Sequence, residues 1–348
     1  MLRPSPYDVG ARLYNLLPAP ALPLPANSEP AEAPPTRMRG EGARGVCGDR
    51  TLAAVTPIPH SAQRFGGFMH GLDLETEYDN RARVPDHQQI FDQWTRDGAA
   101  YRARAGAEGR ATLGLKCGPG PRQTLDIFQA ATGAAAPLAL FIHGGWWRSL
   151  EPSQFSHMAA GLNARGVTVA VAGYDLCPQV AIATIIAQMR QACVFLWRRF
   201  GQPMMVYGHS AGGHLAGAML ATDWPAVDPS LPARLVPAAC SVSGIFDLAP
   251  LVRISVNQDL RLDDAEARRV SPVFWPAPRG TTFDSLVGAR ESSEFLRQAR
   301  LIADAWGNAG VATNYGTVAD TNHFTVCDPL SDPDSAMVAR LAKLAGAR

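Results

Sequence analysis

A serine flanked by glycines is the residue in this sequence best suited to nucleophilic chemistry. Ser210 stands in Gly-His-Ser-Ala-Gly at positions 208–212, which matches the pattern Gly-x-Ser-x-Gly. This pattern is typical of a sharp strand-to-helix turn that exposes a serine hydroxyl at the end of a sheet. A hydroxyl is a weak nucleophile at neutral pH, so Ser210 needs a base within hydrogen-bond reach and an acid that orients the base.

A second motif, upstream of the serine, supplies groups that would stabilise the negative charge formed during its attack. Residues 143–147 read His-Gly-Gly-Trp-Trp, and His-Gly-Gly loops commonly provide backbone N–H groups to an oxyanion. Glycine suits this place because the backbone must approach the substrate closely. The predicted oxyanion hole consists of the N–H groups of Gly144, Gly145 and Ala211, and His143 is expected to fix the loop by hydrogen bonding rather than act as a base.

Two histidines follow Ser210 in the sequence, and one of them is predicted to be the base. His214 comes four residues later, in the helix that Ser210 opens, so it would be carried away from the strand ends into the packed layer beside the sheet. His323 follows the last predicted strand, in Asp-Thr-Asn-His-Phe. The order serine, acid, histidine that accompanies this nucleophile turn also favours His323.

The acid is less narrowly determined, because twelve Asp and Glu residues lie between Ser210 and His323. The role requires a loop directly after the strand that precedes the strand of His323, and Glu291 lies in such a loop. Glu294 stands where a helix begins, a place where a carboxylate complements the helix dipole. Glu291 is therefore the predicted acid. The alternatives left open are Glu294, Asp284, Asp247 and Asp320.

The elements that must position these residues alternate between short apolar strands and helices. Strands are predicted at 113–116, 124–128, 138–142, 167–171, 204–207, 238–242, 283–287 and 311–318. Helices are predicted at 87–104, 155–164, 182–200, 211–221 and 294–306. This alternation implies an α/β fold with a doubly wound, mostly parallel sheet and helices on both faces. Every motif above follows a predicted strand, which is where such sheets carry their chemistry.

Composition restricts the class of protein. The chain has 348 residues, 47% of them hydrophobic and 18% charged, with a formal net charge of +1. These values are those of an ordinary globular protein and argue against a nucleic-acid-binding surface. Six cysteines are scattered without metal-ligand spacing and are expected to be reduced thiols. No apolar run approaches the ~20 residues of a membrane span, and a cytoplasmic location is expected.

The N-terminal part of the chain differs from the rest. Residues 1–68 contain 11 of the 28 prolines, and prolines at this density exclude helices and central strands. We predict a disordered, Pro-rich extension at 1–68 and a single domain at 69–348. We also expect Met69 to be the biological start, with the preceding residues an upstream extension of the reading frame.

Several segments together resemble the kynurenine formamidase (arylformamidase) branch of the α/β-hydrolases, which neighbours the hormone-sensitive-lipase-like esterases. The segments are 143–147, 174–178, 208–215, 243–248, 291–298 and 322–324. The form His-Gly-Gly-x-Trp is what favours the formamidase side. In that family the acid precedes Ser-x-Glu-Phe, and Glu291 precedes Ser-Ser-Glu-Phe here. The resemblance runs from about Met69 to the C-terminus and implies the α/β-hydrolase fold, with glutamate where some relatives have aspartate.

Together these features predict a serine hydrolase that cleaves small acyl esters or aryl formamides with a Ser-His-Glu triad through an acyl-enzyme. No metal or organic cofactor is expected. Its partner would be a small ester or amide substrate, with no nucleic acid and no membrane, and a homodimer is left open. Trp146, Trp147 and Tyr174 are predicted to line the substrate pocket. The alternatives are a thioesterase or acyltransferase, and a hydrolase fold that binds a ligand without catalysis.

Overall fold

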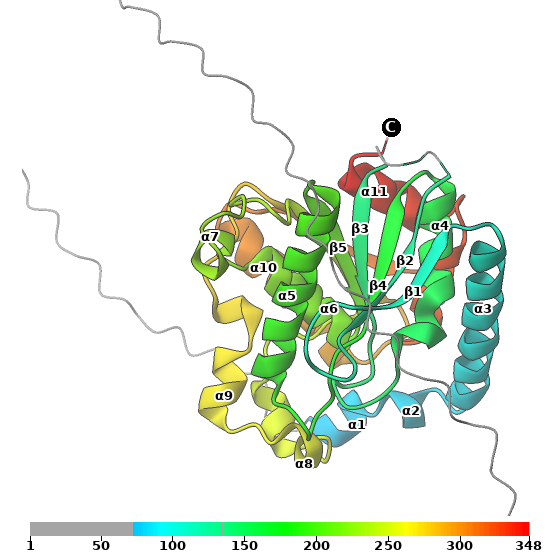
Figure 1. Ribbon diagram of the computed structural model, residues 1–348. Coiled ribbons are helices and arrows are strands. Elements are labelled where there is room, and N and C mark those ends of the chain that lie inside the picture. Colours follow the sequence, from blue (N-terminus) through cyan, green and yellow to red (C-terminus); the bar gives the residue numbers. More distant parts are fainter. Residues whose placement is uncertain (1–71, 132, 134–135, 348) are drawn as a thin grey trace, which may run out of the picture. The chain divides into compact units, whose positions relative to one another are not determined.

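One eight-stranded sheet runs through the part of the chain that this computed structural model describes, residues 72–131, 133 and 136–347 (Figure 1). Across the sheet the order is β1-β2-β4-β3-β5-β6-β7-β8. All neighbours from β4 to β8 are parallel, and β2 runs antiparallel to both of its neighbours. The strands are β1 Ala111–Lys116, β2 Thr124–Phe128, β3 Leu138–Ile142, β4 Thr168–Ala172, β5 Met204–His209, β6 Ala238–Val242, β7 Thr282–Gly288 and β8 Ala312–Val318.

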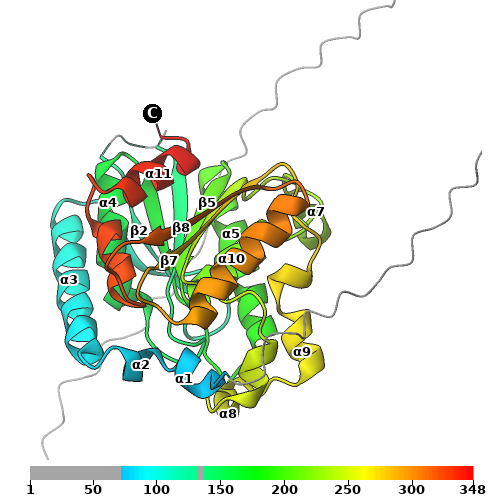
Figure 2. The same ribbon diagram turned by 180° about the vertical axis from the view of Figure 1, so that it is seen from behind.

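Helices cover both faces of this sheet (Figures 1 and 2). One face packs against α5 (Ile182–Phe200), α6 (Ala211–Leu220) and α10 (Ser293–Asn308). The opposite face packs against α3 (His87–Ala107), α4 (Ala160–Ala164) and α11 (Ala336–Ala345). The predicted doubly wound, mostly parallel α/β sheet is thus confirmed. The predictions for 1–68 and for Met69 lie outside the described residues.

Strand β3 contributes side chains to the hydrophobic cores on both faces of the sheet. Leu138, Leu140 and Ile142 belong to the core on the α5 side, whereas Ala139 and Phe141 belong to the core on the α3 side. Successive side chains of a strand point to opposite faces, so a strand buried between two helical layers reads as a continuous apolar run. All five residues are buried, and this strand leads directly into the glycine loop at 143–147.

The sequence predictions missed most of the short helices. The helix expected at 155–164 is a 3₁₀ helix, η1 (Pro152–Ala159), followed by α4. Near the N-terminus of the described chain lie α1 (Leu74–Tyr78) and α2 (Asn80–Arg83), which begin at the capping residues Asp73 and Asp79. Helices of four or five residues are too short for a periodic apolar pattern, so a capping aspartate is their main signal.

The remaining short helices join the longer elements. They are α7 (Trp224–Val227), η2 (Ala249–Arg253), α8 (Asn257–Leu260), α9 (Asp264–Arg269), η3 (Pro272–Phe274) and η4 (Thr325–Ser331). The cysteines in the described part of the chain are free thiols. Among the helices described, none is long and apolar enough to cross a membrane.

Candidate active site

Ser210 stands at the sharp turn between β5 and α6. Its backbone has φ 55° and ψ −117°, a conformation that a residue with a side chain adopts only under strain. The turn is held in place because the Ser210 N–H donates to the carbonyl of Val242 on β6 at 2.8 Å. A Cβ at Gly212 would lie 1.9 Å from the carbonyl oxygen of Ile142, so glycine is required for α6 to pack this close to β3.

His323 lies in the loop after β8 and faces the serine. Its Nε2 is 3.1 Å from Ser210 Oγ, within the reach expected of a general base. The ring packs against Phe295 and Phe324, with centroids 4.4 and 5.4 Å away. The His323 carbonyl accepts a hydrogen bond from His209 Nε2 at 2.7 Å, which ties this loop to the end of β5. Backbone and ring are therefore both fixed.

Glu291, in the loop after β7, meets the other side of the His323 ring. Its Oε2 lies 2.6 Å from His323 Nδ1. Its Oε1 accepts from the Gly288 N–H at 2.7 Å and from the Ser243 hydroxyl. Because a carboxylate accepts only, the proton of the neutral imidazole is on Nδ1 and the Nε2 lone pair faces Ser210. This is the tautomer that can remove a proton from the hydroxyl.

The other carboxylates considered as the acid are engaged elsewhere. Glu294 is buried and bonds to Arg297 at 2.6 Å and to the Tyr78 hydroxyl at 2.8 Å. Burial alone would raise the pKa of Glu294, but the hydrogen bond and charge of Arg297 hold it below its usual value. Asp284, Asp247 and Asp320 bond respectively to Arg340, the Ala249 N–H and Arg290.

The three N–H groups predicted for the oxyanion hole belong to residues that lie beside Ser210. Ala211 is the first residue of α6, so its N–H has no intrahelical acceptor. A Cβ on Gly144 would lie 3.1 Å from Ser210 Cβ, which shows how close this loop comes to Ser210. Gly145 has φ 108°, in the region that favours glycine. Within the described chain, none of the three N–H groups donates to an acceptor, so all are available to a substrate oxygen.

Stacked rings hold the glycine loop in place. The buried His143 ring lies between Tyr174 and Phe155, with centroids 4.4 and 5.5 Å away. His143 Nδ1 donates to the Gly144 carbonyl at 2.7 Å, and the Tyr174 hydroxyl donates to the His143 carbonyl at 2.9 Å. Burial lowers the pKa of His143 to about 4, so the ring is neutral and acts as a support for the loop.

A small cavity of about 30 Å³ opens at Ser210 and His323. Trp146 lines it, but the prediction that Trp147 and Tyr174 do so does not fit the structure, because both are fully buried. Trp147 packs edge-on against His214, with ring centroids 5.0 Å apart. Side chains of consecutive residues diverge in this tight loop, so one tryptophan faces the cavity and the next faces the core.

One wall of the cavity comes from a segment that the sequence predictions did not connect with the site. It consists of Asn80 and Arg81 on α2 and of Phe91 and Trp94 on α3. In Figure 1, α1 and α2 lie at the end of the sheet toward which β3 runs. The pair of helices is short and distant in sequence from Ser210, so no motif marked it as part of the site.

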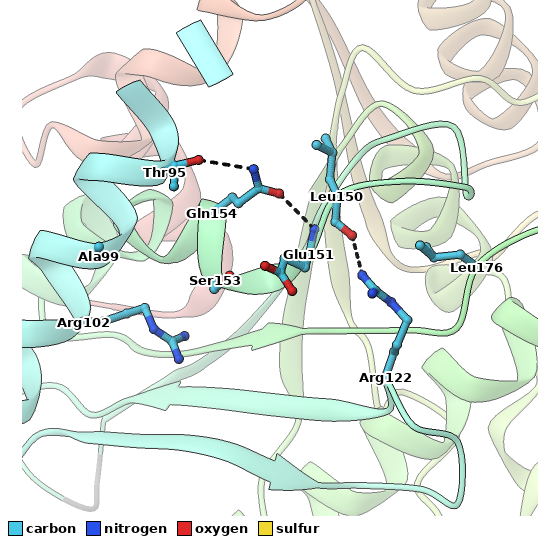
Figure 3. Close-up of a pocket in the computed structure, with 9 residues that line it drawn as sticks. All are labelled: Thr95, Ala99, Arg102, Arg122, Leu150, Glu151, Ser153, Gln154 and Leu176. Carbon is cyan, nitrogen blue, oxygen red and sulfur yellow. Dashed lines mark hydrogen bonds between the residues drawn. The ribbon is translucent and has the colours of Figure 1, made fainter. Parts of the chain in front are cut away.

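A larger groove of about 610 Å³ shares Leu150 with this cavity, and Figure 3 shows the side chains that line it. Several of its polar side chains bond to other protein groups. Arg122 donates to the Leu150 carbonyl, and Gln154 bonds to Thr95 Oγ1 at 3.3 Å and to the Glu151 N–H at 3.2 Å. None of Ser210, Glu291 and His323 lines this groove. Its hydrogen bonds brace the chain just beyond the glycine loop.

Comparison with known proteins finds relatives over much of the chain. Over 254 residues it is 30% identical to a kynurenine formamidase of Salmo salar, covering 70% of this chain and 85% of that protein. It is also 30% identical to a kynurenine formamidase of Drosophila melanogaster over 234 residues, or 64% and 77% of the two chains. No family model matches the chain.

Solved structures show the same architecture. A proposed thioesterase from Silicibacter sp. TM1040 is 33% identical, with a TM-score of 0.71, over 77% of this chain and 98% of that chain. An esterase from Pyrobaculum calidifontis is 15% identical with a TM-score of 0.57, over 76% and 94% of the two chains. The first similarity extends to sequence, whereas the second concerns the fold alone.

Proposed function

The chain belongs to the kynurenine formamidase family of α/β-hydrolases, and from this premise we propose that it cleaves aryl formamides and small acyl esters with Ser210 as the nucleophile. The protein is a hydrolase by family and fold. The observation that carries the serine mechanism is the continuous hydrogen-bonded line from Glu291 through His323 to Ser210, with distances of 2.6 and 3.1 Å.

In the first half of the proposed reaction, Ser210 Oγ attacks the acyl carbon while His323 Nε2 takes the hydroxyl proton. The substrate oxygen becomes an oxyanion that accepts hydrogen bonds from the N–H groups of Gly144, Gly145 and Ala211. The Glu291 carboxylate stabilises the imidazolium that forms. When the tetrahedral intermediate collapses, the bond to the leaving amine or alcohol breaks and His323 returns the proton to it.

The second half releases the acyl group. A water molecule takes the place of the leaving group, gives its proton to His323 Nε2 and attacks the acyl carbon of the Ser210 ester. The oxyanion forms again in the same hole. Collapse breaks the bond to Ser210 Oγ and returns the proton to it, so the products are the free acid, which is formate for a formamide, and the regenerated enzyme.

The size of the cavity supports a small acyl group. About 30 Å³ beside Ser210 is roughly two to three times the volume that one water molecule needs. A formyl group fits this space with little rearrangement, and an acetyl group fits more tightly than a formyl group. The aromatic wall of Trp146, Phe91 and Trp94 suits an aryl leaving group, because offset and edge-on ring contacts stabilise such a group.

The test of this proposal is kcat/KM of the purified protein for N-formylkynurenine, compared with p-nitrophenyl acetate and p-nitrophenyl butyrate. Ser210→Ala serves as the blank. We expect the formamide to be the best substrate and acetate to exceed butyrate. Good ester turnover with negligible formamide cleavage would contradict the formamidase assignment, and turnover retained by Ser210→Ala would contradict the serine mechanism.

A second candidate is the hydrolysis of short acyl thioesters. It is favoured by the 33% identity to the Silicibacter protein described as a thioesterase. The same three side chains would cleave a thioester by the same steps, with a thiolate as leaving group. Release of free thiol from acetyl-coenzyme A, compared with formamide turnover in the same preparation, decides between the two candidates.

A further inference from the structure

The cavity beside Ser210 contains a buried amide that no protein group satisfies. Asn80 on α2 lines the cavity and is only 5% exposed. Its Nδ2 is shielded from solvent and has no hydrogen-bond partner in the described chain. Buried donors without a partner are rare in folded proteins. Because Asn80 lines the cavity at Ser210, a rotation of its side chain would bring this unpaired donor to a bound substrate.

The next residue adds a positive charge at the mouth of the same cavity. Arg81 is exposed, lines the cavity, and lies over the ring of Phe91 at 5.7 Å from the ring centroid. Among the described residues it pairs with no carboxylate, whereas Arg83 on the same helix pairs with Glu77 at 2.7 Å. No acidic side chain lines the cavity. The positive charge of Arg81 is therefore not neutralised where a substrate enters.

We propose that Asn80 and Arg81 form a subsite that binds a carboxylate on the leaving group of the substrate. An amide N–H beside a guanidinium offers charge-assisted hydrogen bonds to an anionic acceptor. The acyl group occupies the narrow space at Ser210, so the part of the substrate that reaches the exposed Arg81 belongs to the leaving group. The inference rests on the proposed function and extends it: α2 favours aryl formamides or esters whose leaving group carries a carboxylate over those whose leaving group lacks one.

The experiment measures binding by calorimetry in Ser210→Ala, where the ligand stays uncleaved. The two ligands are N-formylkynurenine and its carboxamide, in which an uncharged amide replaces the carboxylate. We expect the carboxylate ligand to bind about three- to tenfold more tightly, with a preference that decreases as salt is added. Arg81→Gln in this background removes most of the preference. Asn80→Leu weakens binding of the carboxylate ligand about tenfold or more, because a hydrogen bond to a charged group is lost.

The matched control is Arg96→Gln, which removes the same charge from an exposed residue of α3. Arg96 bonds to Gln93 on its own helix and does not line the cavity, so its replacement should leave the preference unchanged. Equal affinity for both ligands, no binding of either, or a preference that persists in Arg81→Gln would overturn the subsite. Arg81 is exposed, so this variant will fold even if Asn80→Leu does not.

Failure of the subsite and failure of the proposed function give different results. Binding in Ser210→Ala does not depend on turnover, so a carboxylate preference without any hydrolysis by the wild type would retain the subsite and refute the reaction. Rapid formamide hydrolysis by the wild type, together with equal affinity for the two ligands, would retain the reaction and refute the subsite.

Discussion

Replacing Glu291 with glutamine tests whether this residue is the acid of the triad. Both carboxylate oxygens accept hydrogen bonds. One accepts from His323 Nδ1 at 2.6 Å and the other from the Gly288 N–H at 2.7 Å. A glutamine can present an oxygen to only one of them. If its oxygen accepts from Gly288, its NH₂ group points at His323 Nδ1 and forces the proton of that ring onto Nε2.

That tautomer cannot act as a base, because Nε2 then donates toward Ser210 instead of accepting its proton. If the amide turns around, its NH₂ group meets the Gly288 N–H and the loop after β7 must shift. Both orientations therefore impair the base. Loss of the orienting acid in a serine triad lowers kcat by ~10⁴, which corresponds to about 5 kcal/mol of transition-state stabilisation.

The assay is kcat for p-nitrophenyl acetate in Glu291→Gln and in Glu294→Gln, together with the thermal unfolding of both. Glu294 is three positions away and is also buried, but it bonds to Arg297 and Tyr78. We expect Glu294→Gln to lose about 1–3 kcal/mol of stability and to keep kcat within about fivefold, since the interactions made by Glu294 lie away from the reacting atoms.

The result that would refute the reasoning is the reverse pattern, in which Glu294→Gln abolishes turnover and Glu291→Gln retains it. Retention of more than about a tenth of wild-type kcat by Glu291→Gln would also refute it, because a thousandfold or larger loss is expected when the base is held in the wrong tautomer. A folded Glu291→Gln protein is a condition of the test, and thermal unfolding measures it.

Three further predictions concern the surroundings of the triad. Gly145→Ala places a Cβ 2.3 Å from the Ser149 carbonyl oxygen at φ 108°. Displacement of the loop should lower kcat by ~10²–10³ in a protein that still unfolds cooperatively at a lower Tm, and wild-type kcat would contradict the oxyanion-hole assignment. Burial lowers the pKa of His214 from 6.5 to about 4, so between these pH values unfolding takes up a proton and stability falls as pH falls. His214→Gln should reduce that slope by up to about 1.4 kcal/mol per pH unit, measured by urea unfolding from pH 4 to 7, and an unchanged slope would refute a neutral His214. Tyr78→Phe removes the hydroxyl that bonds to Glu294 and Gln298 at 2.8 and 3.0 Å and so weakens the attachment of α1 to α10. Steady-state kinetics should show that KM rises several-fold while kcat stays within about twofold. A large loss of kcat would show that α1 supports the triad itself.

Much of the fold follows from patterns that the sequence displays directly. The central strands are buried on both sides and appear as apolar runs, so β3 and β6 have the bounds predicted for them. The same holds for α5, whose apolar positions recur at helical spacing over nineteen residues. Long elements with one dominant period are readily predicted because many residues report the same periodicity.

The positions of Ser210, Glu291 and His323 were predictable because each residue follows a strand of a parallel sheet. In a parallel sheet the carboxyl ends of neighbouring strands meet at one edge, so residues that follow β5, β7 and β8 lie close together. The structure places the two ring nitrogens of His323 within hydrogen-bond distance of Glu291 and Ser210 respectively. Sequence alone did not exclude Glu294, because its partner Tyr78 is 216 positions away and is recognised only in three dimensions.

The walls of the cavity were not predictable in the same way. Trp146 and Trp147 are adjacent, chemically identical residues with nearly equal φ values of 55° and 54°. The side that each ring faces depends on its packing partners: Trp147 packs against His214 in the core, whereas Trp146 packs against Tyr78 and Phe295. Asn80 belongs to a four-residue helix, and nothing in its local sequence connects it with Ser210.

The proposed catalytic groups and the wall that faces them are therefore held by different means. Ser210, Glu291 and His323 follow strands, so the hydrogen-bonded sheet fixes their spacing. The wall on α2 is attached through α1, where the Tyr78 hydroxyl bonds to Glu294 and the Glu77 carboxylate accepts from Ser293 at 2.6 Å. Both contacts are to α10, which begins just after the loop of Glu291. Substitutions in α2 can therefore change which leaving group is accepted without altering the geometry of proton transfer, since no bond of the triad passes through that helix.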